Sequence, residues 1–147
     1  NMNKITISAL IKNNIEKVWD VWNNEKHIVN WCFAWDDWSC PKSLNNLKTW
    51  GKFITTMAAR DGSMSFDLEW EYISVIDKKS IEYVLIDMQY WEYYIEKWRK
   101  VYLSFEKDWE YTKITETFDA EDIHSLELQR AWWQAILDRF KNYCESL

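Results

Sequence analysis

The sequence predicts a single α+β domain over residues 1–147, in which a curved antiparallel sheet of about six strands wraps around a long C-terminal helix. Three observations lead to this fold class. Most segments before residue 120 alternate apolar and polar residues, as strands with one buried face do. Residues 122–144 instead repeat apolar residues at intervals of three and four, which is typical of an amphipathic helix. The length suits one domain with one core.

The chain begins with a strand and two short helices. Residues 4–11 (KITISALI) alternate apolar and polar residues and predict the first strand. Asn13 or Asn14 is suited to cap the helix that follows, and a second short helical turn is expected after it. Residues 32–50 then lose all periodicity around Pro41, so we expect a loop that is rich in aromatic side chains.

The remaining strands follow as hairpins. Residues 51–60 predict a strand, and the dipeptide Asp61-Gly62 after it is common in hairpin turns. Residues 66–72 give the clearest pattern, with four apolar or aromatic residues on one face and three acidic residues on the other. Further strands are expected around residues 81–85, 101–105 and 114–118.

The composition excludes several classes of protein. A net charge of −6 and an isoelectric point near 5.0 argue against nucleic-acid binding, which needs clustered basic residues. No apolar run approaches the roughly 20 residues that span a bilayer, and the N-terminus lacks the apolar segment of a signal peptide. We therefore expect a cytoplasmic protein without a membrane span. Three cysteines without CxxC spacing predict reduced thiols, not disulfides or a zinc site.

Aromatic residues are the main sign of function. The chain holds 12 Trp, 8 Tyr and 6 Phe beside only two Gly and one Pro. This aromatic surface exceeds what one small core normally uses, so part of it is available for binding.

Six segments carry a resemblance to a known family: KVWDVWNNEKHIVNW, DDWSCP, WGKF, ARDGS, ITETFDAE and HSLELQRAWWQAILDRFKNY. In this order and spacing they resemble bacterial homologues of the activator of the ninety-kilodalton heat-shock protein ATPase. That family belongs to the START and birch-allergen-like (SRPBCC) superfamily, which has the helix-grip fold. The resemblance implies a cavity between sheet and C-terminal helix, where many members hold lipids, sterols, polyketides or other apolar molecules. It implies no defined reaction.

The chain departs from this family at four tryptophans. The resemblance implies a small residue at the positions of Trp35, Trp50, Trp70 and Trp132. Trp70 and Trp132 are expected to face the cavity, where they would either shrink it or line it with flat aromatic walls. The concentration of tryptophan also suggests an engineered variant, although an unusual natural paralogue would look the same.

The second departure is an aromatic insert at residues 87–98, where the family has a tight turn. Its spacing favours a short helix over an extended hairpin. The insert could pack on the domain's own surface or form a lid over the cavity. It could also bind a protein partner or a second copy of the chain through its large side chains, since tryptophan and tyrosine dominate interface hot spots. The residues concerned are Trp91, Tyr94, Ile95 and Trp98.

Polar residues give little support for catalysis. His27 and His124 are expected to be surface or capping residues, and the sequence offers neither a metal site nor a cofactor motif. Glu116 stands out because strand alternation places it on the inward face, where burial without a partner would raise its pKa. Alternatively, Glu116 pairs with Arg60 or Arg130, or faces solvent.

These observations together predict non-catalytic binding of an apolar or aromatic small molecule between the sheet and the C-terminal helix. Glu116 is the expected polar contact. A protein-interaction module that uses the insert is the second interpretation, and an aromatase-like or cyclase-like enzyme is the third. The other residues predicted to line the cavity are Trp35, Trp38, Phe53, Met57, Phe66, Trp70, Tyr83, Trp132 and Ile136.

Overall fold

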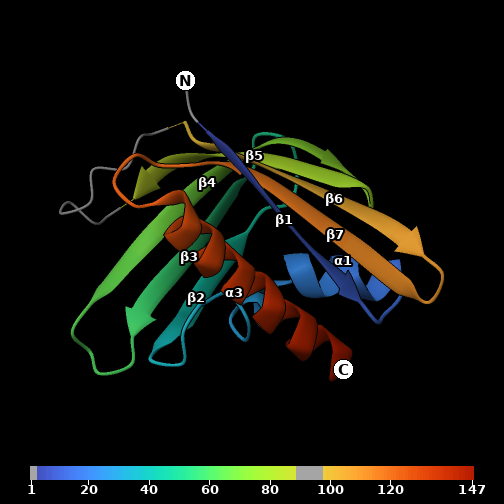
Figure 1. Cartoon of the computed structure of the whole chain (residues 1–147), viewed down its shortest axis with the longest axis horizontal. Helices are drawn as coiled ribbons and strands as arrows, with labels where there is room; N and C mark the ends of the chain where they lie inside the picture. Colours follow the sequence, from blue (N-terminus) through green and yellow to red (C-terminus); the bar gives the residue numbers. More distant parts are fainter. Residues whose placement is uncertain (1–2, 89–97) are drawn as a thin grey trace.

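The computed structural model describes residues 3–88 and 98–147. One antiparallel sheet with the strand order β1-β7-β6-β5-β4-β3-β2 curls around the long helix α3, as the helix-grip fold requires (Figure 1). The strands are β1 (Lys4–Ile11), β2 (Trp38–Asn45), β3 (Lys52–Ala59), β4 (Ser65–Ile76), β5 (Ser80–Met88), β6 (Lys100–Asp108) and β7 (Tyr111–Asp119). The helices are α1 (Ile15–Asn23), α2 (Glu25–Ile28) and α3 (Leu126–Glu145).

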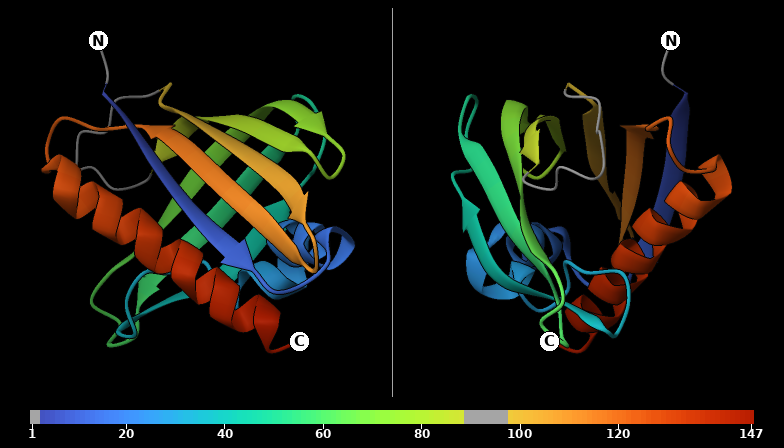
Figure 2. Two further views of the ribbon diagram at one scale, coloured as in Figure 1. Left: turned by 45° about the vertical axis from the view of Figure 1, so that its right-hand side comes forward. Right: turned by 90° about the vertical axis from the view of Figure 1, so that its left-hand side faces the viewer.

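The strands from β2 to β7 pair in sequence order, and β1 closes the sheet by pairing with β7. This last pairing runs from Lys4 beside Asp119 to Ile11 beside Thr112, so it joins the first strand of the chain to the last. The edges of the sheet are therefore β1 and β2. Figure 2 shows α3 lying close to β1 and β7, with β2, β3 and β4 curving away from the helix on the other side.

The prediction of a loop over residues 32–50 is wrong for β2, which brings the sheet to seven strands. A shift in the pairing between β2 and β3 falls between Ser39 and Lys42, around Pro41. Such a bulge breaks the two-residue periodicity, which is why the sequence pattern did not reveal the strand. Proline is tolerated here because an edge strand leaves some of its N–H groups unpaired.

The helix boundaries are fixed by side-chain caps. Asn14 accepts a hydrogen bond from the backbone N–H of Lys17 at 2.8 Å, as expected for the start of α1. The long helix begins at Leu126 and not at residue 122, because the Ser125 hydroxyl caps it by accepting from the backbone N–H of Leu128 at 3.1 Å.

The core lies where α1 and the C-terminal half of α3 meet the sheet. Trp22 of α1 packs on Trp31 and on Phe140 of α3, with ring centroids 4.6 and 4.8 Å apart. Phe105 of β6 meets Trp19 of α1 at 5.1 Å. Among the described helices, none is long and apolar enough to cross a membrane.

The aromatic insert is described only at its ends. Met88 is the last residue of β5 and pairs with Leu68 of β4, so the predicted helix does not begin at Met88. Residues 89–97 lie outside the described part of the chain, and a helix within them stays a prediction.

Candidate functional site

The concave face of the sheet presents a row of aromatic side chains. Strand alternation directs Phe66, Trp70 and Tyr72 of β4 inward, as the sequence predicts. Phe53 of β3 lies opposite Trp70, and Tyr83 of β5 lies opposite Tyr72, so these residues share the inward face.

The long helix covers only part of this face. Trp133 of α3 stacks on Phe118 of β7 with ring centroids 3.9 Å apart, and its edge lies 6.4 Å from Trp70. Apart from the buried Thr55, the large inward side chains of β3 and of the first half of β4 are only half-buried, in contrast to those of β6 and β7. The concave face is therefore covered over β7 and partly exposed over β3 and β4. The half-buried side chains are Phe53, Met57, Phe66 and Leu68.

Glu116 lies on the covered side of this face. It sits in the middle of β7, opposite Ile7 of β1 and Leu103 of β6, and only 4% of its surface is exposed. Burial alone raises the pKa of its carboxyl from 4.5 to about 8, so the carboxyl is mostly protonated at neutral pH.

Neither arginine that the sequence offers as a partner for Glu116 is paired with it. Arg60 donates through Nε to the carbonyl oxygen of Asp36 at 2.8 Å, and Arg130 donates through Nη1 to the carbonyl oxygen of Thr6 at 2.6 Å. Within the described part of the chain, no residue forms a hydrogen bond with the Glu116 carboxyl. Glu116 is thus a buried side chain whose carboxyl has no hydrogen-bond partner among the described residues.

Two buried phenols lie on the same face. The ring of Tyr83 meets Trp70 edge-on at 5.0 Å and Phe53 at 6.2 Å. Burial, and then the nearby Glu116, raises the pKa of Tyr83. Burial also raises the pKa of Tyr72, whose hydroxyl donates to the Oδ1 atom of Asn45. Both phenols therefore stay neutral inside an aromatic surrounding, where the Tyr72 hydroxyl already donates to Asn45 and can only accept a further hydrogen bond.

A pair of thiols adds to this interior. Cys32 and Cys40 are free thiols. A hydrogen bond from Cys32 to Cys40, together with burial, raises the pKa of Cys32, and the same hydrogen bond lowers the pKa of Cys40. Cys32 also interacts electrostatically with Glu116, so the thiol and the carboxyl belong to one neighbourhood.

Of the remaining predicted lining residues, two lie near the concave face and two lie apart from it. Trp38 packs on Phe66 at 6.1 Å, which places it beside the half-exposed part of the face, and Ile136 of α3 is half-buried against the core. Trp35 lies apart from them, because 45% of its surface is exposed in the loop before β2. Trp132 also lies apart, with its ring against His124 at 4.7 Å.

The apolar stripe of the long helix includes Trp133, but the predicted lining residues include Trp132 from its flank instead. Trp133, and not Trp132, contacts Phe118 and Trp70 on the sheet. The signal was present, because Trp133 belongs to the same apolar stripe as Leu137 and Phe140, which are fully buried.

The predicted partner-binding residues are mostly beyond what the structure describes. Trp98 is described, and 65% of its surface is exposed. Trp91, Tyr94 and Ile95 lie outside the described residues, so protein binding through the insert stays a prediction.

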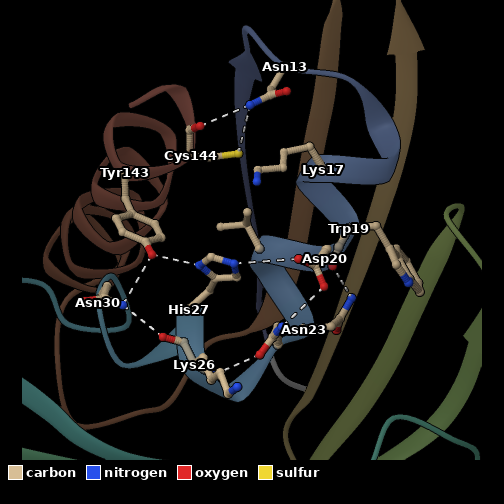
Figure 3. A network of polar contacts seen from close by, with 12 residues as sticks. Asn13, Lys17, Trp19, Asp20, Asn23, Lys26, His27, Asn30, Tyr143 and Cys144 are labelled. Atoms are coloured by element: carbon tan, nitrogen blue, oxygen red, sulfur yellow. Dashed lines mark hydrogen bonds and ion pairs between the residues drawn. The ribbon is translucent and has the colours of Figure 1, made fainter. Parts of the chain in front are cut away.

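A second polar cluster ties the helices together (Figure 3). The Nδ1 atom of His27 lies 2.8 Å from the hydroxyl of Tyr143, and its Nε2 atom lies 3.7 Å from Asp20. Asn13 donates to the carbonyl oxygen of Cys144 at 3.1 Å. His27 therefore bridges α1, α2 and the end of α3, which is a structural role.

A shallow surface hollow adjoins this cluster beside α3. Its basic lining residue, Arg139, is already paired with Asp36 at 2.7 Å and lies 4.3 Å from the ring centroid of Phe33. Across the described residues, no group of three or more acidic, histidine or cysteine side chains could hold a metal ion. The concave face with Glu116 is therefore the stronger candidate site.

Comparison with known proteins agrees with this geometry. The family model described as Activator of Hsp90 ATPase homolog 1-like protein matches residues 12–145. The solved structure of an AHSA1-like protein from Aeromonas hydrophila is similar, with 37% identity and a TM-score of 0.86, covering 98% of this chain and 93% of its own. A protein from Cytophaga hutchinsonii has 43% identity and a TM-score of 0.79, covering 97% of this chain and 92% of its own.

More distant structures share the fold alone. A protein from Chromobacterium violaceum is 13% identical with a TM-score of 0.84, covering 97% of each chain. No curated protein matches this chain. The similarity to the proteins from Aeromonas and Cytophaga gives no support to the interpretation of the chain as an engineered variant.

Proposed function

This chain belongs to the family of Activator of Hsp90 ATPase homolog 1-like proteins, and we therefore propose that it binds an apolar or aromatic small molecule on the concave face of its sheet. Domains of this fold typically have a ligand-binding cavity between sheet and helix. Binding, without a chemical reaction, is the activity that we assign.

The observation that carries this proposal is the unpartnered carboxyl of Glu116 inside an aromatic interior. A buried polar group without a hydrogen bond costs about 1–3 kcal/mol, and an apolar residue of similar size would avoid this cost. A bound molecule that reaches Glu116 would supply the missing partner.

Apolar burial would provide most of the affinity. Phe53, Phe66 and Leu68 keep part of their surface exposed on the concave face, although they point toward the interior. Covering such surface contributes roughly 25 cal/mol per Å² before the cost of ordering the ligand is subtracted. The aromatic wall therefore favours flat apolar ligands, and the few polar groups would set their orientation.

Titration of the protein with fused-ring alcohols such as 2-naphthylmethanol tests the proposal. Calorimetry should show saturable binding of one ligand per chain, and sedimentation of the same sample should show whether the binding species is a monomer. Absence of saturable binding by any fused-ring alcohol would contradict the proposal.

A substitution that fills the concave face provides the structural control. Leu68→Trp adds bulk beside Phe66 on the inward face and should weaken binding at least about tenfold, which corresponds to about 1.4 kcal/mol. Leu44→Trp is the matched control, because Leu44 is exposed on the edge strand β2. Equal affinities of the two variants would place the ligand elsewhere on the protein.

A further inference from the structure

We propose that the bound molecule carries a protonated amine that pairs with Glu116 and lies against the aromatic rings around Tyr83. This inference rests on the function proposed above, because it names the chemical class of that same ligand. It rests on three features of the concave face: an acid without a partner, a wall of aromatic rings, and the absence of a nearby cation among the described residues.

The first feature is the position of Glu116. Its side chain starts from the middle of β7, and the flanking residues Ile7 and Leu103 are buried apolar side chains that cannot form hydrogen bonds with it. Burial raises the pKa of its carboxyl, and no described cation forms an ion pair or a hydrogen bond with it. A ligand cation would supply that stabilisation.

The aromatic rings provide the second feature. Trp70, Tyr83 and Phe53 form one connected cluster with ring centroids 5.0 and 6.2 Å apart. Aromatic faces carry negative charge density and attract ammonium groups that have lost part of their water. A ligand with an aromatic body and a short aminoalkyl arm would use both the rings and the carboxyl.

The third feature is the absence of a positive charge beside Glu116 among the described residues. The buried cation Arg99 donates through Nη1 to the carbonyl oxygen of Asp119, at the end of β7. The groups that interact electrostatically with Glu116 are the phenol of Tyr83 and the thiol of Cys32. Neither brings a positive charge, so the described site complements a cation and not an anion.

A neutral ligand is the competing possibility, because a protonated Glu116 can donate a hydrogen bond to a carbonyl group. The two cases differ in the fate of the Glu116 proton. Pairing with an ammonium group requires the carboxylate, so the proton leaves for the buffer, whereas a carbonyl ligand leaves the proton in place.

Most other titratable groups on this face would not obscure that measurement, and Glu116→Gln distinguishes a proton of Glu116 from one of the exception, Cys40. The pKa values of Tyr83 from β5, Tyr72 from β4 and Cys32 from the loop after α2 are all raised, so these groups stay protonated at neutral pH. The pKa of Cys40 is lowered through its interaction with Cys32. The inward side chains of α3, such as Trp133 and Ile136, do not titrate.

The test compares three ligands that share one ring system: 2-naphthylmethylammonium, 2-naphthylmethanol and 2-naphthaldehyde. Calorimetry at pH 7 in phosphate and in Tris buffer gives both the affinity and the number of protons released. We expect the ammonium compound to bind at least about tenfold more tightly than the alcohol. Its binding should release about 0.9 proton per chain, because Glu116 has a pKa of about 8.

Glu116→Gln should remove both the preference for the amine and the proton release, so that the ammonium compound and 2-naphthylmethanol bind to the variant with similar affinity. Proton release by the unchanged protein provides a second measurement that does not depend on the folding of the variant.

The outcomes separate the two proposals. Equal affinity for the amine and the alcohol would overturn the amine inference and leave the proposed function standing. Tightest binding of the aldehyde without proton release would also overturn it, in favour of a neutral ligand. Binding of none of the three would overturn the amine inference and contradict the proposed function as well.

Discussion

Replacing Glu116 with glutamine should make the unfolding free energy less dependent on pH and should stabilise the protein at alkaline pH. Glutamine has nearly the shape of a protonated glutamate but cannot ionise. The substitution therefore keeps the packing against Ile7 and Leu103 and removes only the cost of a buried carboxylate.

The direction and the size of this change in pH dependence follow from the pKa of Glu116. The carboxyl titrates at about 8 in the folded chain and at 4.5 in the unfolded chain, so the folded state holds one more proton between these pH values. Stability from this group is fully present below pH 4.5 and is lost as pH rises through 8. At about 1.4 kcal/mol for each pKa unit, the loss reaches up to about 5 kcal/mol above pH 9.

Urea unfolding of both proteins at several pH values from 4.5 to 9.5 measures this loss. The difference in unfolding free energy between Glu116→Gln and the unchanged protein should be near zero at the acid end and should grow steadily with pH. Glu106→Gln is the matched control, because Glu106 is exposed on the neighbouring strand β6. A difference for Glu116→Gln that stays constant with pH would refute the view that Glu116 is buried without a partner.

Three further substitutions test the fold around the site. Trp109 is 97% exposed and has a φ of 59°, a left-handed backbone conformation that glycine adopts without strain. Trp109→Gly should therefore raise the unfolding free energy by about 0.5–1 kcal/mol, while Trp109→Ala should not. Equal effects of the two substitutions in urea unfolding would contradict this. Trp133→Ala should cost about 3 kcal/mol because it removes the stack on Phe118, whereas Trp132→Ala should cost less than half as much by the same assay. Tyr143→Phe removes the hydroxyl that contacts His27 and should lower the unfolding free energy from urea unfolding by about 1 kcal/mol. This loss should vanish when the substitution is made in the His27→Ala variant.

The sequence predicted those parts of the site that depend on local periodicity. The alternation from Phe66 to Tyr72 identified the inward face of β4, since a strand buries every second residue. The same rule placed Glu116 inside. The resemblance to a family supplied what periodicity does not, namely the expectation of a ligand cavity between the sheet and the helix.

Other parts of the fold and of the site depend on contacts between distant segments of the chain, which no local sequence pattern encodes. β2 escaped prediction because its pairing with β3 shifts at Pro41. Arg130 was an available partner for Glu116 in the sequence, but its guanidinium is committed to Thr6, 124 residues away.

The two walls of the concave face differ in a way that suits ligand binding. Glu116 is held by a strand that is paired on both sides, over residues 112–119 with β1 and over residues 111–118 with β6, so its position is rigidly defined. The opposite wall, on β3 and β4, carries half-buried aromatic side chains with fewer packing partners. A rigid polar anchor fixes the orientation of a ligand, whereas a less tightly packed apolar wall can adjust to its shape. Substitutions at Glu116 should therefore change ligand selectivity more than stability at acid pH, and substitutions on β3 should change the range of ligand sizes.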